Sequence, residues 1–418
     1  MADEAASHYS AFIDNMSLAL RILNETFGEC GRPTVAWQID PFGQSKEAAS
    51  IFAQLGFDGL FFCRLDYRDK ARRKAEQELE MVWEASTDLG VSADLFTHVL
   101  YNEYGPPPGF CWDLPCDDEP ISEGENGNIE ERADALVAWV KEQASHYRTN
   151  HVILTMGEDF QYQAAHSWFL NLDRVMANIN ARGEELGLTI YYSTPSCYLK
   201  AVRETETSWP RESGDFLPYA SDEHSYWSGF FTSRPSSKFL IREAEKLSAV
   251  ADRLGVQDGS SAGKGAWSLQ GEQGVQGGAA AGEGARSLQG ERVQGGAGEG
   301  ARSLHKAVAV VQHHDAITGT EKERVASDYH QRLHSAIEAA FLELGLEPSY
   351  NRLSSRDSFC PLLNISQCPM LDSLQADSPQ RLQIFNPLAR TVQPTIRCST
   401  KQNLMHSLGY LSRTTPTT

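Results

Sequence analysis

Short apolar runs alternate with longer helical patterns over roughly the first 210 residues of the chain. The runs contain few polar positions and no regular alternation, as expected for strands that are covered on both faces. They are Thr34–Asp40, Gly59–Leu65, His151–Met156 and Leu188–Thr194. Apolar residues at helical spacing lie between them, over Lys46–Leu55, Arg73–Ser86, Glu130–Tyr147 and Ala164–Leu186. This order of elements predicts an α/β domain with a mostly parallel sheet and flanking helices.

A further helix is predicted at the start of the chain, from about Asp3. Phe12, Met16, Leu20 and Leu23 follow at steps of 4, 4 and 3 residues, which puts them on one helix face. Asp3 would open this helix, and its carboxylate would then cap the first turn or stabilise the helix dipole. The same backbone N–H groups would also keep the carboxylate ionised, fit to attack a substrate or to bind a metal.

The pattern changes to successive helices from about Tyr226, with helices predicted over Ser237–Leu254 and Lys306–Leu344. Between them, Gly255–Gly300 holds 15 of the 33 glycines and imperfect copies of one short phrase. The repeat could indicate a solenoid. Its glycine content and its lack of apolar periodicity favour a flexible insert instead.

These patterns divide the chain into three predicted regions. We expect an α/β domain over residues 1–215, a helical-bundle domain over 216–345 with the Gly-rich insert at 255–304, and the start of a β domain over 346–418. The third region rests on the strand-like runs Arg381–Pro387 and Thr391–Arg397. A length of 418 residues agrees with two or three domains.

Composition excludes several classes of protein. The chain has 37 Lys+Arg and 56 Asp+Glu, a net charge of −19, so we expect neither a nucleic-acid partner nor an anionic membrane surface. A hydrophobic fraction of 41% is sufficient for a packed core. No apolar run approaches the ~18 residues that a membrane-spanning helix needs. Residues 1–10 also lack the apolar segment of a signal peptide.

Two pairs of cysteines lie close in sequence, Cys111 with Cys116 and Cys360 with Cys368. Neither pair has the spacing of a structural zinc site, so we predict small-loop disulfides and an oxidising compartment. Three N-glycosylation sequons agree with that compartment: Asn15-Met16-Ser17, Asn24-Glu25-Thr26 and Asn364-Ile365-Ser366.

Several aspartates stand where an α/β fold places its functional groups. Asp40, Asp66 and Asp159 follow predicted strands, and Asp113 lies in the loop between Cys111 and Cys116. Ligands of open α/β sheets bind at the carboxyl edge of the strands. Each of these residues, taken singly, could equally be a solvated or turn-initiating aspartate.

A second cluster, His313-His314-Asp315, lies in a predicted helical region. Adjacent residues of a helix point about 100° apart, so at most one of the two histidines would face a given site. The sequence Thr318-Gly319-Thr320 predicts a helix break just after the cluster, which would free these side chains. On its own, the cluster is weak evidence for a metal site.

Taken together, several phrases resemble the class II α-mannosidases of glycoside hydrolase family 38, closest to the lysosomal type. The similar segments are Met1–Ala5, Val35–Gly43 (VAWQIDPFG), Gly56–Phe62, Tyr147–His151, Tyr192–Leu199, Tyr226–Pro235 (YWSGFFTSRP) and Gln312–Thr320 (QHHDAITGT). The resemblance covers the chain to about Leu254 and again from Lys306 to about Arg397.

The resemblance implies a retaining, zinc-dependent exo-hydrolase that removes α-linked mannose from glycans. It implies that Asp3 is both the nucleophile and a zinc ligand, and that His314 is a second zinc ligand. Asp113 is then the acid/base. Asp40, Trp227 and Asp315 are substrate-binding residues. We expect Asp3, Asp40, Asp113 and His314 to converge at the carboxyl edge of the sheet.

The resemblance also implies what this chain lacks. The family's other zinc ligands, a His-x-Asp pair, and the first strands of its sheet lie upstream of the segment that matches Met1–Ala5. Two ligands out of four would hold zinc poorly, so we expect slow hydrolysis or none. The alternative function is a non-catalytic glycan-binding remnant of an α-mannosidase. The resemblance implies mannose-containing oligosaccharides as partners, and a lysosomal or secretory-pathway location.

Overall fold

The computed structural model describes residues 1–116, 118–258 and 298–343. These residues belong to two compact units. The first contains residues 1–242 and 306–330, and the second contains 243–258, 298–305 and 331–343. The C-terminal β domain, the Cys360–Cys368 pair and most of the Gly-rich insert lie outside the described residues.

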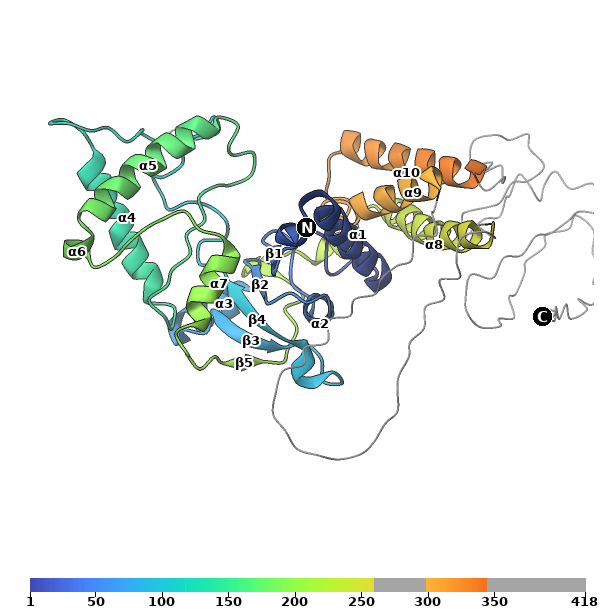
Figure 1. The fold of residues 1–418 in the computed structure, drawn as a ribbon, viewed down its shortest axis with the longest axis horizontal. Helices are drawn as coiled ribbons and strands as arrows, with labels where there is room; N and C mark the ends of the chain where they lie inside the picture. The colour runs from blue at the N-terminus through green and yellow to red at the C-terminus, as the bar shows by residue number, and fades with distance from the viewer. Residues whose placement is uncertain (117, 259–297, 344–418) are drawn as a thin grey trace, which may run out of the picture. The chain divides into compact units, whose positions relative to one another are not determined.

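A five-stranded sheet lies at the centre of the first unit (Figure 1). Its strands are β1 (Val35–Gln38), β2 (Gly59–Phe62), β3 (Glu80–Glu84), β4 (Asp94–Val99) and β5 (Arg211–Glu212), in the order β1-β2-β4-β3-β5. Every neighbouring pair is parallel except β3 and β4, which are antiparallel. The prediction of a mostly parallel sheet is confirmed.

The apolar runs form a core on both faces of this sheet. Each of the four residues of β2 is buried, as expected for a central strand of a parallel sheet. On one face Leu60 and Phe62 pack with Phe52 of α2 (Lys46–Gln54). On the other face Phe61 packs with Leu199 of α7 (Pro195–Arg203). The sheet is therefore fixed between helices, and its strand ends are held in place.

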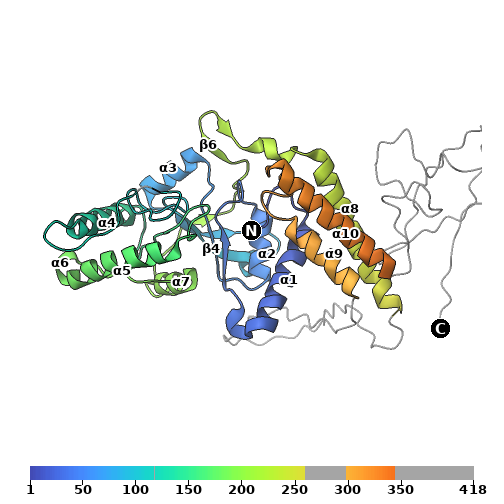
Figure 2. The ribbon, with the colours of Figure 1, turned by 90° about the horizontal axis from the view of Figure 1, so that it is seen from above.

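The remaining elements of the first unit are mostly helical. They are α1 (Tyr9–Phe27), η1 (Glu29–Gly31), α3 (Tyr67–Glu76), η2 (Gly90–Ala93), α4 (Ile129–Ala144), α5 (Ala165–Ala181), α6 (Gly183–Leu186), β6 (Ala220–Asp222), β7 (Ser225–Tyr226) and η3 (Ser228–Phe231). The helices α4 and α5 lie side by side in both views (Figures 1 and 2). Leu136 of α4 and Trp168 and Leu172 of α5 share one buried cluster.

Three long helices follow: α8 (Pro235–Asp258), α9 (Glu299–Val310) and α10 (Glu323–Glu343). Within the second unit, apolar residues of α9 and α10 are buried, among them Leu304, Leu333 and Ile337. The predicted helix Lys306–Leu344 is in fact two helices, and the break expected at Thr318–Thr320 is confirmed. Gly319 has a φ of 74° there, a conformation that favours glycine.

Two predicted strands, 151–156 and 188–194, are wrong. Neither segment pairs with a strand among the described residues. Their apolar side chains, including Leu154 and Ile190, pack against the cluster of α4 and α5 instead. The side-chain amide of Asn180 donates to the Ile190 carbonyl and accepts from the Ile190 N–H, which takes the place of a neighbouring strand.

Two helix predictions are also corrected. The first helix begins at Tyr9 rather than near Asp3, and Phe12 is the only one of its four predicted core residues that is fully buried. The predicted helix Arg73–Ser86 covers only the end of α3, which stops where Gln77 adopts a left-handed conformation. Strand β3 follows, and its Met-Val-Trp centre is rich in residues that favour strands.

The disulfide predicted between Cys111 and Cys116 is present. Among the helices that the structure describes, none is both long and apolar enough to cross a membrane.

One buried ion pair ties α3 to the edge strand β5. The Arg73 side chain, 3% exposed, donates to Glu212 Oε2 at 2.6 Å and to Asp69 Oδ2 at 2.9 Å. Although partial burial favours the protonated form of Glu212, the N–H of Gly214 and the Arg73 guanidinium lower the pKa of this carboxyl below its ordinary value of 4.5.

Replacing Glu212 with glutamine is therefore expected to lower the free energy of unfolding by about 1–3 kcal/mol at neutral pH. A depressed carboxyl pKa contributes stability that is present above pH 4.5 and is lost as the pH falls through the folded-state pKa. The difference between wild type and variant should shrink below that pH. Urea unfolding from pH 7 downward checks this. Glu204→Gln, at an exposed pair with Lys200, should change stability little at any pH.

Candidate active site

The first residues of the chain pair with the His-His segment. Ala2 and His313 form an antiparallel bridge, and the Asp3 N–H donates to the Gln312 carbonyl at 2.9 Å. The His314 N–H donates to the Met1 carbonyl at 3.3 Å. Because no helix contains either segment, both Asp3 and His314 are free to point toward the end of strand β1. The pairing brings together two residues that are 311 positions apart in sequence (314 − 3).

The Asp3 carboxylate is fixed but only half satisfied. Its side chain is buried, and Oδ2 accepts the N–H groups of Ala5 at 3.1 Å and Ala6 at 2.5 Å. Its other oxygen, Oδ1, is buried without a hydrogen-bond partner in the part of the chain that the structure describes. Burial raises the pKa of Asp3, although those two N–H groups and the nearby His314 and Lys238 act in the opposite direction.

Glu4 anchors the same segment to the sheet. Its carboxylate accepts the Gln38 side-chain amide at 2.9 Å and the Ser45 N–H at 2.6 Å. The same Gln38 amide donates to the Ala2 carbonyl at 2.9 Å. Burial raises the pKa of Glu4 to about 8, against the effect of these two donors. Both neighbours of Asp3 are thus attached to β1, which limits how far Asp3 can move.

His314 faces a carboxylate. Its ring Nδ1 lies 3.1 Å from the Met1 carbonyl oxygen, which can only accept, so Nδ1 carries the proton. The other nitrogen, Nε2, lies 3.2 Å from Asp40 Oδ2. In the neutral ring with the proton on Nδ1 two acceptors would then face each other, an arrangement that a cation bound to both groups would stabilise.

Asp40 is held by Arg64. The guanidinium donates to Asp40 Oδ1 from Nε at 3.0 Å and from Nη2 at 2.5 Å, and both side chains are largely buried. Burial alone would raise the pKa of Asp40, but His314 and Arg64 lower it below its ordinary value. Asp40 follows β1 and Arg64 follows β2, so the parallel strands bring both residues to one edge of the sheet.

The donor types of these groups suit a metal ion. The unpartnered Asp3 Oδ1, His314 Nε2 and Asp40 Oδ2 are oxygen and nitrogen donors of the kind that zinc binds. A histidine that donates its other ring N–H to a carbonyl is also the usual arrangement for a metal ligand. Among the described residues, the one group of three whose ligand atoms all lie within 4.8 Å of one another is His313, His314 and Asp315.

Asp315 has partners of its own. The Thr320 hydroxyl donates to Asp315 Oδ1 at 2.9 Å, and His313 Nε2 lies 3.4 Å from Oδ2. His313 is the main cause of the lowered pKa of Asp315.

Aromatic side chains border the cluster formed by Asp3, Asp40, Arg64 and His314. Trp227 is half-buried against the rings of Phe42 and Tyr219, with centroid distances of 5.1 and 5.2 Å. The Arg64 guanidinium lies 5.1 Å from the Trp227 ring centroid. Phe42 also meets the His314 ring edge-on at 6.1 Å. Trp227 therefore belongs to the same neighbourhood as Asp40 and His314.

The structure does not join Asp113 to this cluster. Asp113 is buried, and its carboxylate accepts the N–H groups of Leu114 and Ala164 and the indole N–H of Trp168. Burial alone would raise the pKa of Asp113, but these hydrogen bonds lower it. Asp113 therefore stays ionised and fixes its loop to α5.

Sequence reasoning missed a group around Tyr104. The Arg64 guanidinium donates to the Tyr104 hydroxyl at 3.3 Å. Burial raises the pKa of Tyr104, and the negative charges of Asp40, Asp159 and Glu158 add to this effect. Burial also raises the pKa of Glu158, followed by the charges of Asp159 and Glu103. The position of Asp159 just after the apolar run 151–156 was a usable signal, although this run forms no strand. Nothing in the sequence connected Glu158 or Tyr104 with Asp40.

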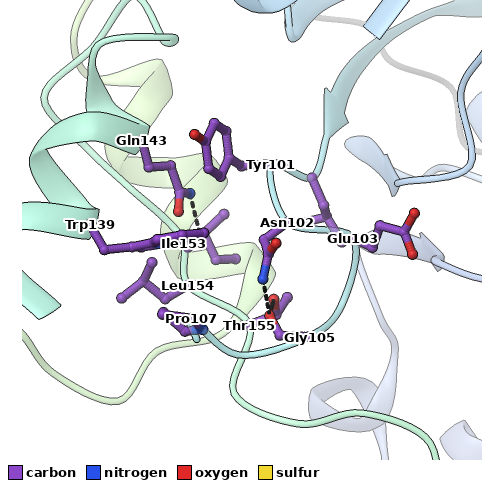
Figure 3. Close-up of a pocket in the computed structure, with 11 residues that line it drawn as sticks. Tyr101, Asn102, Glu103, Gly105, Pro107, Trp139, Gln143, Ile153, Leu154 and Thr155 are labelled. Atoms are coloured by element: carbon purple, nitrogen blue, oxygen red, sulfur yellow. Dashed lines mark hydrogen bonds between the residues drawn. The ribbon is translucent and has the colours of Figure 1, made fainter. Parts of the chain in front are cut away.

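A small pocket supports the loop that carries Glu103 and Tyr104 (Figure 3). On its wall the Gln143 amide donates to the Ile153 carbonyl at 2.9 Å, and the Thr155 hydroxyl donates to the Gly105 carbonyl at 2.9 Å. Figure 3 shows Glu103 pointing away from this pocket. Its carboxylate lies 3.3 Å from Arg64 Nη1 instead. The hydrogen bonds in the wall of the pocket hold the loop in place. The pocket is lined by none of Asp3, Asp40, Arg64 and His314.

A much larger groove begins beside Tyr104 and Ile39. It has a volume of about 1400 Å³. Its wall includes Trp37, Tyr104, Glu158, Tyr162, Phe169 and Tyr192. Aromatic faces and carboxylates together suit a ligand that has both apolar C–H faces and hydroxyl groups.

Two family models match the chain. The glycosyl hydrolases family 38 N-terminal domain matches residues 1–222, and the alpha mannosidase middle domain matches residues 225–341. The lysosomal alpha-mannosidase of Cavia porcellus is 40% identical over 432 residues, which cover 100% of this chain and 39% of that protein. The lysosomal alpha-mannosidase of Felis catus is 42% identical over 406 residues, covering 95% of this chain and 37% of that protein. The chain therefore spans well under half the length of these relatives.

A solved structure shows the same fold. The crystal structure of an alpha-mannosidase from Enterococcus faecalis V583 aligns with a TM-score of 0.52 at 16% sequence identity. The alignment covers 82% of this chain and 32% of that one.

Proposed function

Because the chain belongs to glycosyl hydrolase family 38, we propose that it serves the hydrolysis of α-linked mannose from glycans, with retention of configuration and with zinc at the Asp3–His314 cluster. The observation that carries this proposal is the buried Asp3 carboxylate, whose Oδ1 has no partner in the described residues. It lies beside a histidine whose Nε2 faces the Asp40 carboxylate. A bound zinc would supply Lewis-acid stabilisation and would orient the sugar hydroxyls.

Asp3 fits the role of the nucleophile. Its Oδ2 is held by the N–H groups of Ala5 and Ala6, and Glu4 limits the movement of its backbone. In the retaining reaction the Asp3 carboxylate forms a bond to the anomeric carbon while the bond to the leaving oxygen breaks, and water then hydrolyses the mannosyl ester. We assign Asp40, Trp227 and Asp315 to substrate binding, with the Trp227 ring packed against the C–H face of the sugar.

A retaining mechanism also needs a second carboxyl group ~5 Å from the first, with a pKa that keeps its proton until the bond breaks. We propose that the pair Glu158–Asp159 provides this group, because the pKa of Glu158 is raised and both charges act on Tyr104. The assignment of this role to Asp113 stays a prediction of the resemblance that the geometry does not favour, since hydrogen bonds keep Asp113 ionised.

The dependence of rate on the leaving group tests this assignment. Loss of the acid is expected to lower the rate ~100- to 10,000-fold on a natural mannoside, whose leaving oxygen needs a proton. The loss should be far smaller on a dinitrophenyl α-mannoside, whose leaving group departs unprotonated. Of Asp159→Asn and Glu158→Gln, the variant that removes the acid should show a large loss of rate on the natural mannoside and a small loss on the dinitrophenyl mannoside. Asp113→Asn should lower stability without changing the leaving-group dependence. The reverse pattern would return the role to Asp113.

The second candidate function is glycan binding without hydrolysis, and the groove of about 1400 Å³ lined by aromatic residues favours it. Two measurements on the 418-residue chain decide between the candidates: turnover of an aryl α-mannoside at acidic pH with zinc, and binding of a mannose oligosaccharide by calorimetry. Turnover supports the enzyme. Saturable binding without turnover supports the binding protein. If the chain shows neither turnover nor binding, both candidate functions are wrong.

We also propose passage through the secretory pathway, with a lysosomal destination. The Cys111–Cys116 disulfide supports an oxidising compartment, and the matched relatives are named lysosomal.

A further inference from the structure

Two glycosylation sequons lie on α1, and their environments differ. The Asn15 side chain is half-buried, and its Nδ2 donates to the Ala309 carbonyl at 2.6 Å, a contact between residues 294 positions apart. Asn24 lies in the last turns of the helix with its side chain exposed. Within the described residues its side chain makes no hydrogen bond. Thr26 of the same sequon is also exposed, and its hydroxyl donates to the Ile22 carbonyl at 2.7 Å.

We propose that Asn24 carries an N-linked glycan and that Asn15 does not. The donor is a lipid diphosphate-linked oligosaccharide in the lumen of the secretory pathway. The Asn24 amide nitrogen forms a bond to the anomeric carbon, the bond from this carbon to the lipid diphosphate breaks, and the amide loses one proton. The same reaction at Asn15 would attach a sugar to a half-buried nitrogen that lies 2.6 Å from the Ala309 carbonyl. The modified nitrogen keeps one N–H, but the sugar has to fit beside Ala309, which opposes the packing of Asn15 in the folded chain.

The position of Asn24 also indicates what the glycan does. Ile13, Leu20 and Phe27 are spaced seven residues apart and share one face of α1, and Tyr9 lies on the same face. The exposed fractions of Tyr9 and Phe27 are 61% and 62%, high for large apolar side chains. Asn24 follows Leu20 by four residues and precedes Phe27 by three, so it lies within this apolar stripe. A glycan attached there covers the stripe and keeps it from associating with other apolar surfaces.

The inference depends on passage through the secretory lumen and is independent of zinc binding and hydrolysis. The test uses the full chain behind a cleavable secretion signal in a cell that performs N-glycosylation. Peptides are analysed by mass spectrometry after enzymatic deglycosylation in heavy-oxygen water, which marks each asparagine that carried a glycan. This site-by-site measurement also keeps the third sequon, at Asn364, from being confused with the two on α1.

In wild type we expect the mark at Asn24 in most molecules of the soluble fraction, and none at Asn15. Thr26→Ala keeps Asn24 but removes its sequon, so the mark should disappear. Thr26→Ser keeps both the sequon and a hydroxyl, so the mark should remain. An unmodified Asn24 in wild type, or a modified Asn15 in soluble protein, would overturn the inference.

The covering role has its own readout. The unglycosylated Thr26→Ala chain should bind more of an apolar fluorescent dye and should elute partly as aggregates, whereas Thr26→Ser should match wild type. Replacing Phe27 with serine in the Thr26→Ala chain should reverse the aggregation. If both Thr26 variants behave alike, the glycan does not cover the stripe.

Discussion

Replacing Asp3 with asparagine is expected to lower the affinity of the chain for zinc by roughly 100-fold or more, above the 10- to 100-fold loss that is typical for groups behind the ligands. The substitution removes the charge of the one carboxylate oxygen in the cluster that is buried and unpartnered. It also removes the proposed nucleophile, so whatever hydrolysis of aryl α-mannosides the wild type shows should fall at least ~1000-fold. Competition with a fluorescent zinc chelator, followed by a rate assay, measures both effects.

Unfolding in the presence of a strong chelator separates loss of metal from loss of structure. Without metal, the ionised Asp3 carboxylate lowers the stability of the folded chain, because burial disfavours its charge and raises its pKa. The Asp3→Asn chain should then unfold at the same or a higher urea concentration than wild type. Asp88→Asn removes one exposed negative charge and should leave zinc affinity and stability unchanged. Equal zinc affinity of the Asp3→Asn chain and wild type would contradict the assignment of Asp3.

Replacing Arg64 with methionine is expected to lower the free energy of unfolding by about 3 kcal/mol, near the lower end of the cost of unpairing a buried ion pair. The exposed fractions of the Arg64 and Asp40 side chains are only 12% and 17%, so water can replace the lost guanidinium only in part. Asp40 would then keep its charge with His314 as its main partner. Urea unfolding in chelator at neutral pH measures the loss.

The double variant Arg64→Met with Asp40→Asn is the matched control. It leaves no unpaired charge, so it should recover part of the stability that the single substitution loses. Together with Asp40→Asn alone, these variants form a double-mutant cycle, which gives the coupling free energy of the Arg64–Asp40 pair directly. A loss below about 0.5 kcal/mol for Arg64→Met, with no coupling, would show that water satisfies Asp40 and that the pair does not hold the site.

The convergence of Asp3, Asp40, Asp113 and His314 was expected from the resemblance. The structure places His314 Nε2 3.2 Å from Asp40 Oδ2 and pairs the Asp3 backbone with that of Gln312. Two local signals were present in the sequence. Asp40 ends an apolar run before a Pro-Phe-Gly turn, and Gly319 predicted the break in the helix after His314. The reason given for Asp3 was wrong, since Asp3 precedes α1 and is fixed by its pairing with Gln312. A pairing over 309 positions (312 − 3) leaves no periodic pattern in a sequence.

The errors have the same physical origin. Apolar runs report burial, but burial in a sheet and burial against helices give the same pattern when the run is short. In the segments 151–156 and 188–194, only some apolar side chains are partly buried against the cluster of α4 and α5, among them Leu154 and Ile190, and their apolar character predicted strands that did not form. The acid/base role that the resemblance gave to Asp113 stays a prediction, and its carboxylate turns to Ala164 and Trp168. The direction of a side chain on a loop depends on partners that local sequence does not show.

The most direct test of the account is a crystal structure of the zinc-loaded chain, with anomalous scattering measured at the zinc absorption edge. We predict one anomalous peak within ~2.0–2.2 Å of both Asp3 Oδ1 and His314 Nε2, the usual distances for carboxylate and imidazole ligands. A peak bound by His313 and Asp315 and remote from Asp3, or no peak at saturating zinc, would contradict it.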